Sequence, residues 1–250
     1  MGENKYWGVI DLKKPEMILF DFGDTILINE TEPDFVHGTK KVMELADNTN
    51  GVSPEEVQIF ADSLVKILFE DRKNQIIQVN EQCFNRFLYG YFGIQFSREP
   101  LELERAFWNH TYHFKPAPGI TELFDFLDEQ GIRKAILSNN AFEESTLRQE
   151  LCRHFPGKEF EFIISTADYC FRKPSPFIFN LALKMAGLEK GKVWYAGNSL
   201  LSDVAGADSA GIFPVWYNSI NEKPDDKYRH INYMEIPCWY QLVESLKEME

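Results

Sequence analysis

The pattern of apolar and polar positions begins with a short buried strand. Residues 17–20, Met-Ile-Leu-Phe, form an uninterrupted apolar run that leads straight into Asp21 and a Gly-Asp-Thr cluster. An apolar run of this length, bounded by turn residues, is typical of a strand that is buried on both faces, as in a parallel sheet. We therefore expect a central strand here, with a carboxylate at its carboxyl end.

Between residues 28 and 115 the apolar positions recur at helical spacing. Ser53 is a predicted N-cap, Pro54 takes the first helical position and Glu56 completes a capping box. Three further stretches, beginning near residues 34, 81 and 100, are patterned in the same way, and their aromatic stripes are expected to fill a bundle core. The aromatic residues of these stripes include Phe84, Phe87 and Tyr91. The segment 28–115 thus predicts a small all-helical cap of three or four helices.

After residue 116 strands and helices alternate. Apolar runs at 134–137, 160–164, 192–196 and 213–217 predict strands, and the stretches 120–131, 175–187 and 202–211 predict helices. This repeated order is typical of a parallel sheet with helices on both faces. We expect an α/β protein with a Rossmann-like core formed by residues 1–27 and 116–250, and the helical cap 28–115 inserted into it.

Composition narrows the range of partners. The chain carries 26 Lys+Arg against 39 Asp+Glu, a net charge of −13, and no basic cluster stands out. Binding to nucleic acid or to an anionic membrane is therefore not expected. No segment reaches the ~18 apolar residues of a membrane helix. The four scattered cysteines fit a reducing compartment, so we predict a cytoplasmic protein, and we expect these cysteines to be core thiols. The sequence does not indicate the oligomeric state.

Candidate chemistry collects at the predicted strand ends. Asp21 follows the first strand, Ser138 and Asn139 the second, Lys173 comes after the third, and Asn198 with Asp203 follows the fourth. Reacting groups gather beyond the carboxyl ends of parallel strands. A carboxylate, a hydroxyl, an ammonium and further hard oxygen donors together indicate a site for a phosphate group and a divalent metal such as Mg2+.

Four stretches in this order resemble the motifs of the haloacid dehalogenase (HAD) superfamily, and specifically its phosphatase-like members with a helical cap inserted after the first strand. They are FDFGDTIL (residues 20–27), ILSNN (136–140), RKPSPFIF (172–179) and YAGNSLLSDVAGADSAG (195–211). The resemblance implies a Mg2+-dependent phosphohydrolase that acts on a small phosphorylated metabolite. It also implies that Asp21 forms an aspartyl-phosphate, that Ser138 and Asn139 contact the substrate, and that Lys173 offsets negative charge. Mg2+ would be bound by Asp21, the Gly23 carbonyl and Asn198, with Asp203 holding these ligands in place.

Two positions depart from the family pattern. Gly23 stands where phosphatases of the family carry an Asp that acts as general acid, and Asn198 replaces a metal-binding Asp. Asp24 could supply the proton instead, or the leaving group could need none, or catalysis could be lost. Two other functions therefore stay open. One is a halide-displacing hydrolase of the same superfamily, against which counts the lack of any Arg between Asp21 and Arg72; the other is a non-catalytic protein that binds a phosphorylated ligand.

Overall fold

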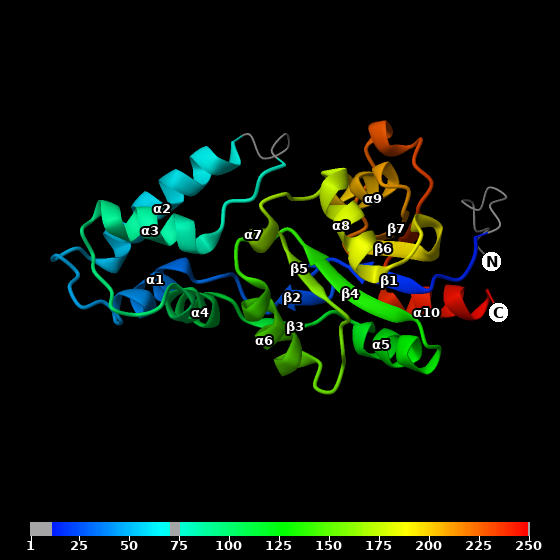
Figure 1. Ribbon diagram of the computed structural model, residues 1–250, viewed down its shortest axis with the longest axis horizontal. Helices are drawn as coiled ribbons and strands as arrows, with labels where there is room; N and C mark the ends of the chain where they lie inside the picture. Colours follow the sequence, from blue (N-terminus) through cyan, green and yellow to red (C-terminus); the bar gives the residue numbers. More distant parts are fainter. Residues whose placement is uncertain (1–11, 71–75, 250) are drawn as a thin grey trace.

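The computed structural model describes residues 12–70 and 76–249, so residues 1–11 of the predicted core lie outside it. In the described part, six parallel strands form one sheet in the order β5-β4-β1-β6-β7-β8 (Figure 1). The strands are β1 (Met17–Phe20), β4 (Arg133–Ser138), β5 (Ile163–Ser165), β6 (Val193–Gly197), β7 (Phe213–Tyr217) and β8 (Met234–Ile236). The predicted Rossmann-like α/β class is confirmed, although β8 was not predicted and β5 begins later than expected.

Helices cover both faces of the sheet (Figure 1). One face packs against α8 (Pro176–Ala186) and α9 (Gly206–Ser209), and the other against α5 (Ile120–Glu129), α6 (Glu144–His154) and α10 (Trp239–Lys247). Successive side chains of a strand point to opposite faces. In β1, Leu19 accordingly joins the α8 side, whereas Ile18 and Phe20 join the α5 and α10 side. Both faces are apolar, which explains the uninterrupted apolar run of β1.

The residues between β2 (Leu27–Asn29) and β3 (Phe114–Pro116) form what we call the helical insertion. They contain α1 (Phe35–Met43), α2 (Pro54–Phe69), α3 (Glu81–Tyr91) and α4 (Pro100–Thr111), which lie to one side of the sheet in Figure 1. The capping box at α2 is confirmed, because Ser53 Oγ accepts from Glu56 N at 3.2 Å and Ser53 N donates to Glu56 Oε2 at 2.9 Å. The antiparallel pair β2 and β3 was not predicted, and the cap boundaries 28–115 stay a prediction.

Helix α4 of the insertion docks along α6 of the core through buried side chains. Glu104 Oε1 accepts hydrogen bonds from Glu143 N at 2.8 Å and from Thr146 Oγ1 at 2.7 Å. One helical turn further on, Trp108 Nε1 donates to Glu150 Oε2 at 3.0 Å. The N-cap residue of α6, Glu143, makes no capping bond with its own side chain. A carboxylate from the insertion therefore accepts a hydrogen bond from one of the backbone N–H groups at the amino end of a core helix.

Two expectations about side-chain burial are wrong. Cys83, Cys152 and Cys170 are exposed and Cys238 is only partly buried, so these thiols do not fill the core. Phe87 and Tyr91 on α3 are 57% and 64% exposed. Helical spacing identifies residues that share a face, but it does not reveal whether a partner covers that face. Among the described residues, no helix is long and apolar enough to cross a membrane.

Candidate active site

The carboxyl end of the sheet brings together the residues singled out at the predicted strand ends. Strand β1 lies between β4 and β6, and the chain fills the sheet first on one side of β1 and then on the other. Such a change of direction opens a crevice at the strand ends. Asp21 directly follows β1, and its N–H donates to the Ala196 carbonyl oxygen of β6 at 2.9 Å. Ser138 ends β4 and Gly197 ends β6.

Lys173 lies at the centre of this group. Its Nζ atom donates to Asp21 Oδ1 at 2.8 Å, to Asp203 Oδ1 at 2.6 Å and to the phenol oxygen of Tyr195 at 2.5 Å. These contacts use all three donors of the ammonium group. Lys173 is only 2% exposed, and burial alone would lower its pKa, but the charges and hydrogen bonds of Asp203 and Asp21 outweigh burial and raise the pKa. Lys173 therefore carries a fixed positive charge next to Asp21.

Asp203 is held from two sides. Its Oδ1 atom binds Lys173, and its Oδ2 atom accepts from the backbone N–H of Ser199 at 2.8 Å. Burial raises the pKa of the Asp203 carboxyl, and the Lys173 charge offsets part of that rise. A β-carbon on Gly197 would lie 2.4 Å from Asp203 Cγ, closer than atoms can approach. Glycine at the end of β6 therefore makes room for Asp203 to reach Lys173.

Tyr195 is a site residue that the sequence analysis did not identify. It lies in the middle of β6, fully buried, and its phenol oxygen donates to the Leu137 carbonyl oxygen at 2.8 Å while it accepts from Lys173. Burial, followed by the charges of Asp203 and Asp21, raises its pKa well above the ordinary value. The available signal was a hydroxyl-bearing ring in an otherwise apolar strand, since a buried phenol requires a hydrogen-bond partner.

Asn139 links the loop after β4 to the loop that carries Lys173. Its Oδ1 atom accepts from Lys173 N at 2.8 Å, and its Nδ2 atom donates to the Lys173 carbonyl oxygen at 2.9 Å. Both polar atoms of the amide are thus engaged by one residue, and a contact of Asn139 with substrate stays a prediction. Ser138 is buried beside this link, at the end of β4. The amide clamp fixes the position of Lys173 relative to Ser138.

The turn after Asp21 has a glycine, Gly23, where the family pattern has an acidic residue, and its acidic residue is Asp24. Asp24 takes a left-handed backbone conformation, with φ of 54°, and its N–H donates to the Leu27 carbonyl oxygen at 2.8 Å. Gly23 has no positive φ, and a β-carbon there would meet nothing within 4 Å. The Asp24 side chain is exposed, yet the neighbouring protein atoms and then the Asp21 charge raise its pKa. An acidic side chain is therefore present near Asp21, one position later than the family pattern has it.

The remaining predicted metal ligand, Asn198, lies at the end of β6. Its carbonyl oxygen accepts from Trp216 Nε1 at 3.0 Å, and none of the described residues hydrogen-bonds its side-chain amide. The described part of the chain contains no group of three or more His, Cys, Asp or Glu side chains that could hold a metal ion. Because Asp203 is engaged through both oxygens, Asp21 is the carboxylate that a metal here would use, together with backbone and amide oxygens.

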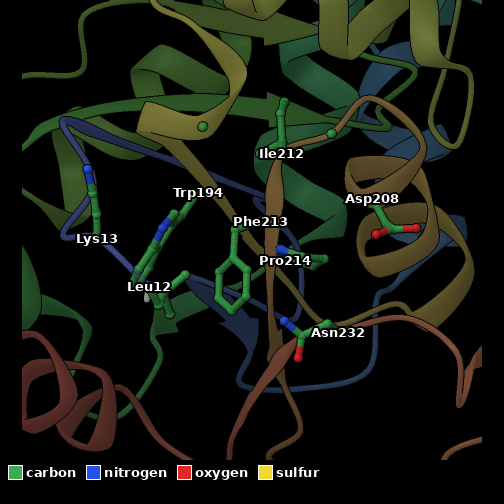
Figure 2. A pocket seen from close by; sticks show the side chains of 10 residues that line it. Leu12, Lys13, Trp194, Asp208, Ile212, Phe213, Pro214 and Asn232 are labelled. Carbon is green, nitrogen blue, oxygen red and sulfur yellow. The ribbon is translucent and has the colours of Figure 1, made fainter. Parts of the chain in front are cut away.

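A hollow of about 380 Å3 lies elsewhere, at the amino ends of β6 and β7. Figure 2 shows the rings of Trp194 and Phe213 among the residues that line it, with the Asn232 side chain close to Phe213. Trp194 lies near the start of β6, whose opposite end approaches Asp21, and Phe213 begins the neighbouring strand β7. The candidate catalytic groups are therefore not among the residues that line this hollow.

Comparison with known proteins agrees with this geometry. Residues 18–217 match the family described as haloacid dehalogenase-like hydrolase. The pyrimidine 5'-nucleotidase YjjG of Escherichia coli is 28% identical over 155 residues, which cover 61% of this chain and 63% of that protein. The match thus spans less than two thirds of the length of that relative.

Solved structures with the same fold include both phosphatases and dehalogenases. A HAD phosphatase from Thermococcus onnurineus superposes with a TM-score of 0.63 at 21% identity, covering 92% of this chain and 97% of the other. The 2-haloacid dehalogenase from Pseudomonas syringae gives a TM-score of 0.65 at 18% identity, covering 94% and 99%. At these identities the likeness concerns the fold alone.

Proposed function

Because the chain belongs to the haloacid dehalogenase-like hydrolase family, we propose that it hydrolyses the phosphate of a small phosphorylated metabolite through an aspartyl-phosphate, with Mg2+ as cofactor. The observation that carries the proposal is the buried contact between Asp21 and Lys173, at 2.8 Å, where the sheet changes direction. A carboxylate held at a strand end by a fixed cation is an aimed oxygen nucleophile.

The reaction would proceed in two displacements. An Asp21 oxygen attacks phosphorus, the bond from phosphorus to the ester oxygen breaks, and the departing oxygen takes up a proton. Oδ1 of Asp21 is held by Lys173, whereas within the described part of the chain Oδ2 has only a long contact, 3.5 Å, with Thr25 Oγ1. Oδ2 is therefore the oxygen we assign to the attack. Water then hydrolyses the acyl-phosphate bond and regenerates the carboxylate.

Lys173 and Ser138 would stabilise the developing charge. The ammonium of Lys173 offsets negative charge that gathers around the Asp21 carboxylate, and its own buried partners keep it protonated. The Ser138 hydroxyl, buried at the end of β4, would donate to a phosphoryl oxygen. Tyr195 and Asp203 accept hydrogen bonds from the Lys173 side chain, and Asn139 hydrogen-bonds the Lys173 backbone.

The residues at the site fit Mg2+ as a set of hard oxygen donors. Asp21, the Gly23 carbonyl and the Asn198 amide oxygen would hold the ion, and none of the described residues hydrogen-bonds the Asn198 side chain, which leaves its oxygen available for this. Asp203 would support them through the Ser199 backbone, next to Asn198. When bound, the metal would offset charge on the phosphate group. One carboxylate fewer than in the family pattern predicts weaker metal binding.

Protonation of the leaving oxygen is assigned to Asp24. Asp24 lies in the turn directly after Asp21, and its pKa is raised from the ordinary value, which is the direction that suits a proton donor. Its position after Gly23 leaves a second route open, in which the natural substrate has a leaving group that needs no proton, such as the carboxylate released from an acyl phosphate. Relative rates on alkyl, aryl and acyl phosphates separate these routes.

The decisive experiment is a screen of the purified protein against alkyl, aryl and acyl phosphates, with and without Mg2+, and against 2-haloacids. We expect phosphate release that needs Mg2+, loss of turnover in Asp21→Asn, and trapping of the wild type by beryllofluoride as an aspartyl-phosphate mimic. The exposed Asp208, replaced by Asn, is the matched control. Halide release without phosphate release would favour the dehalogenase alternative, and binding without turnover would favour a non-catalytic protein.

A further inference from the structure

A segment of the helical insertion, running from beyond α2 into the first turn of α3, crosses over to the core. We call residues 76–82 the strap. Arg172 N donates to the Ile76 carbonyl oxygen at 2.8 Å, and Gln78 N donates to the Cys170 carbonyl oxygen at 2.6 Å. Further along, Glu81 N donates to the Ala141 carbonyl oxygen at 2.8 Å. The strap therefore binds the backbone of two core loops, residues 139–143 after β4 and residues 170–173 after α7 (Thr166–Tyr169).

The side chain of Gln78 extends this connection into the core. It is 7% exposed, its Nε2 atom donates to the Val79 carbonyl oxygen at 2.8 Å, and its Oε1 atom lies 3.2 Å from Thr166 Oγ1. Thr166 Oγ1 in turn accepts from Asn140 N at 3.0 Å. The single hydroxyl proton of Thr166 is shared between Gln78 Oε1 and the Asn140 carbonyl oxygen at 3.3 Å. Gln78 is thus joined through Thr166 to the loop that follows Ser138.

The two loops that the strap binds carry candidate catalytic groups. Ser138 immediately precedes the first loop, and Lys173 belongs to the second. The Asn139 amide already ties one loop to the other within the core. The strap adds hydrogen bonds that originate in the helical insertion, so the position of the insertion and the spacing of the two loops are coupled. A misplacement of about 1 Å in such groups can cost about a hundredfold in rate.

We propose that Gln78 is a positioning residue: docking of the strap through Gln78 and Thr166 fixes the loops that place Ser138 and Lys173 around the phosphate group. The proposal rests on the proposed phosphohydrolase function for its kinetic consequences. Its structural consequence, ordering of residues 139–143 and 170–173 by the strap, is independent of which phosphate ester is cleaved.

Gln58 offers a matched control, because it is also a 7% exposed glutamine of the insertion. Gln58 Oε1 accepts from Thr39 Oγ1 at 2.6 Å and Gln58 Nε2 donates to Asp62 Oδ1 at 2.7 Å, so its partners lie within the insertion. Gln78→Met keeps the volume of the side chain and removes its hydrogen bonds. We expect Gln78→Met to lower kcat/KM for an aryl phosphate by about tenfold or more, and Gln58→Met to change it less than about twofold.

A double-mutant cycle separates positioning from general destabilisation. Thr166→Val breaks the same chain of hydrogen bonds, so its effect on kcat/KM should not add to that of Gln78→Met. Fully additive effects would overturn the proposed connection. A Gln78→Met protein with wild-type kinetics would overturn the positioning role.

Hydrogen exchange gives a readout that does not depend on turnover. Gln78→Met should speed exchange of backbone amides in both 139–143 and 170–173, whereas Gln58→Met should not. Faster exchange confined to the strap would contradict the proposal, even in an active enzyme. If the wild type releases no phosphate but both loops respond to Gln78→Met, the positioning role stands and the proposed function fails.

Discussion

The phenol oxygen of Tyr195 lies 2.5 Å from Lys173 Nζ, at the only position along β6 where a hydroxyl meets the site. Tyr195→Phe removes this acceptor and leaves a buried ammonium donor unpaired. We expect the free energy of unfolding to fall by about 1–3 kcal/mol, and turnover to fall by about tenfold as Lys173 shifts relative to Asp21. Denaturant unfolding and steady-state kinetics measure both. Tyr228→Phe, at a buried tyrosine of a separate cluster, should leave turnover unchanged.

Gly197→Ala should damage the site without a change in charge. The added β-carbon would lie 2.4 Å from Asp203 Cγ, so Asp203 has to move away from Lys173. Overpacking of this kind costs about 1–3 kcal/mol of folding free energy, and we expect turnover to drop at least tenfold. Gly191→Ala is the control, since a β-carbon there meets nothing within 4 Å. Equal melting temperatures and rates for the two variants would show that the contact is not restrictive.

Gly23→Asp should be tolerated and should favour alkyl phosphates. Gly23 has no positive φ and its surroundings are open, so an Asp fits without backbone strain. If protonation of the leaving oxygen limits the rate, the variant should raise kcat/KM for alkyl phosphates by about tenfold or more and should change kcat/KM for aryl phosphates little.

The companion variant is Asp24→Asn, because Asn tolerates the left-handed backbone at this position. It should lower alkyl-ester turnover far more than aryl-ester turnover if Asp24 donates the proton. Equal losses on both classes of ester would remove Asp24 from that role.

Asn198→Asp should tighten the response to Mg2+. A full negative charge next to the ion is worth more than about 1.4 kcal/mol, so the Mg2+ concentration for half-maximal activity should fall by about tenfold or more. The rise in melting temperature on adding Mg2+ should grow in parallel. Asn232→Asp makes the same charge change at the hollow beside the amino ends of the strands. An identical metal response of both variants and the wild type would exclude Asn198 as a ligand.

Glu81 should make the protein less stable as the pH rises. Burial, and then the Glu104 charge, raise the pKa of the Glu81 carboxyl to about 7, although the Asn85 amide lowers it. The folded state therefore binds a proton that the unfolded state has released, so the free energy of unfolding falls between about pH 4.5 and 7. Because Glu81 keeps some exposure to solvent, about 3 kcal/mol is the upper limit of this loss in the free energy of unfolding.

Glu81→Gln should remove this pH dependence and raise the melting temperature at pH 8, while it leaves that at pH 5 nearly unchanged. The exposed Glu102, replaced by Gln in the same way, should behave like the wild type at both pH values. A wild-type melting temperature that does not fall across this range would contradict the raised pKa.

The sequence predicted those features that depend on local pattern. The capping box of Ser53 and Glu56 involves neighbours in the chain, and the run before Asp21 is apolar because both faces of β1 are covered. Tyr195 escaped notice because its role depends on Lys173, 22 residues away in the chain. The strap has no apolar period at all, and its partners lie near residues 141 and 170. Contacts of this range leave no pattern in a single sequence.

The pairing of β2 with β3 places Asn29 opposite Phe114, so the chain leaves the core and returns to it at one point. The helices between these two residues could lengthen, shorten or change their surface without altering the distance between the two junctions. Substitutions there would change the surface that the insertion presents while Asp21, Lys173 and Asp203 keep their mutual spacing. The exceptions are the strap, where a replacement of the insertion would have to preserve the hydrogen bonds of Gln78, and α4, whose Glu104 and Trp108 hydrogen-bond the core helix α6.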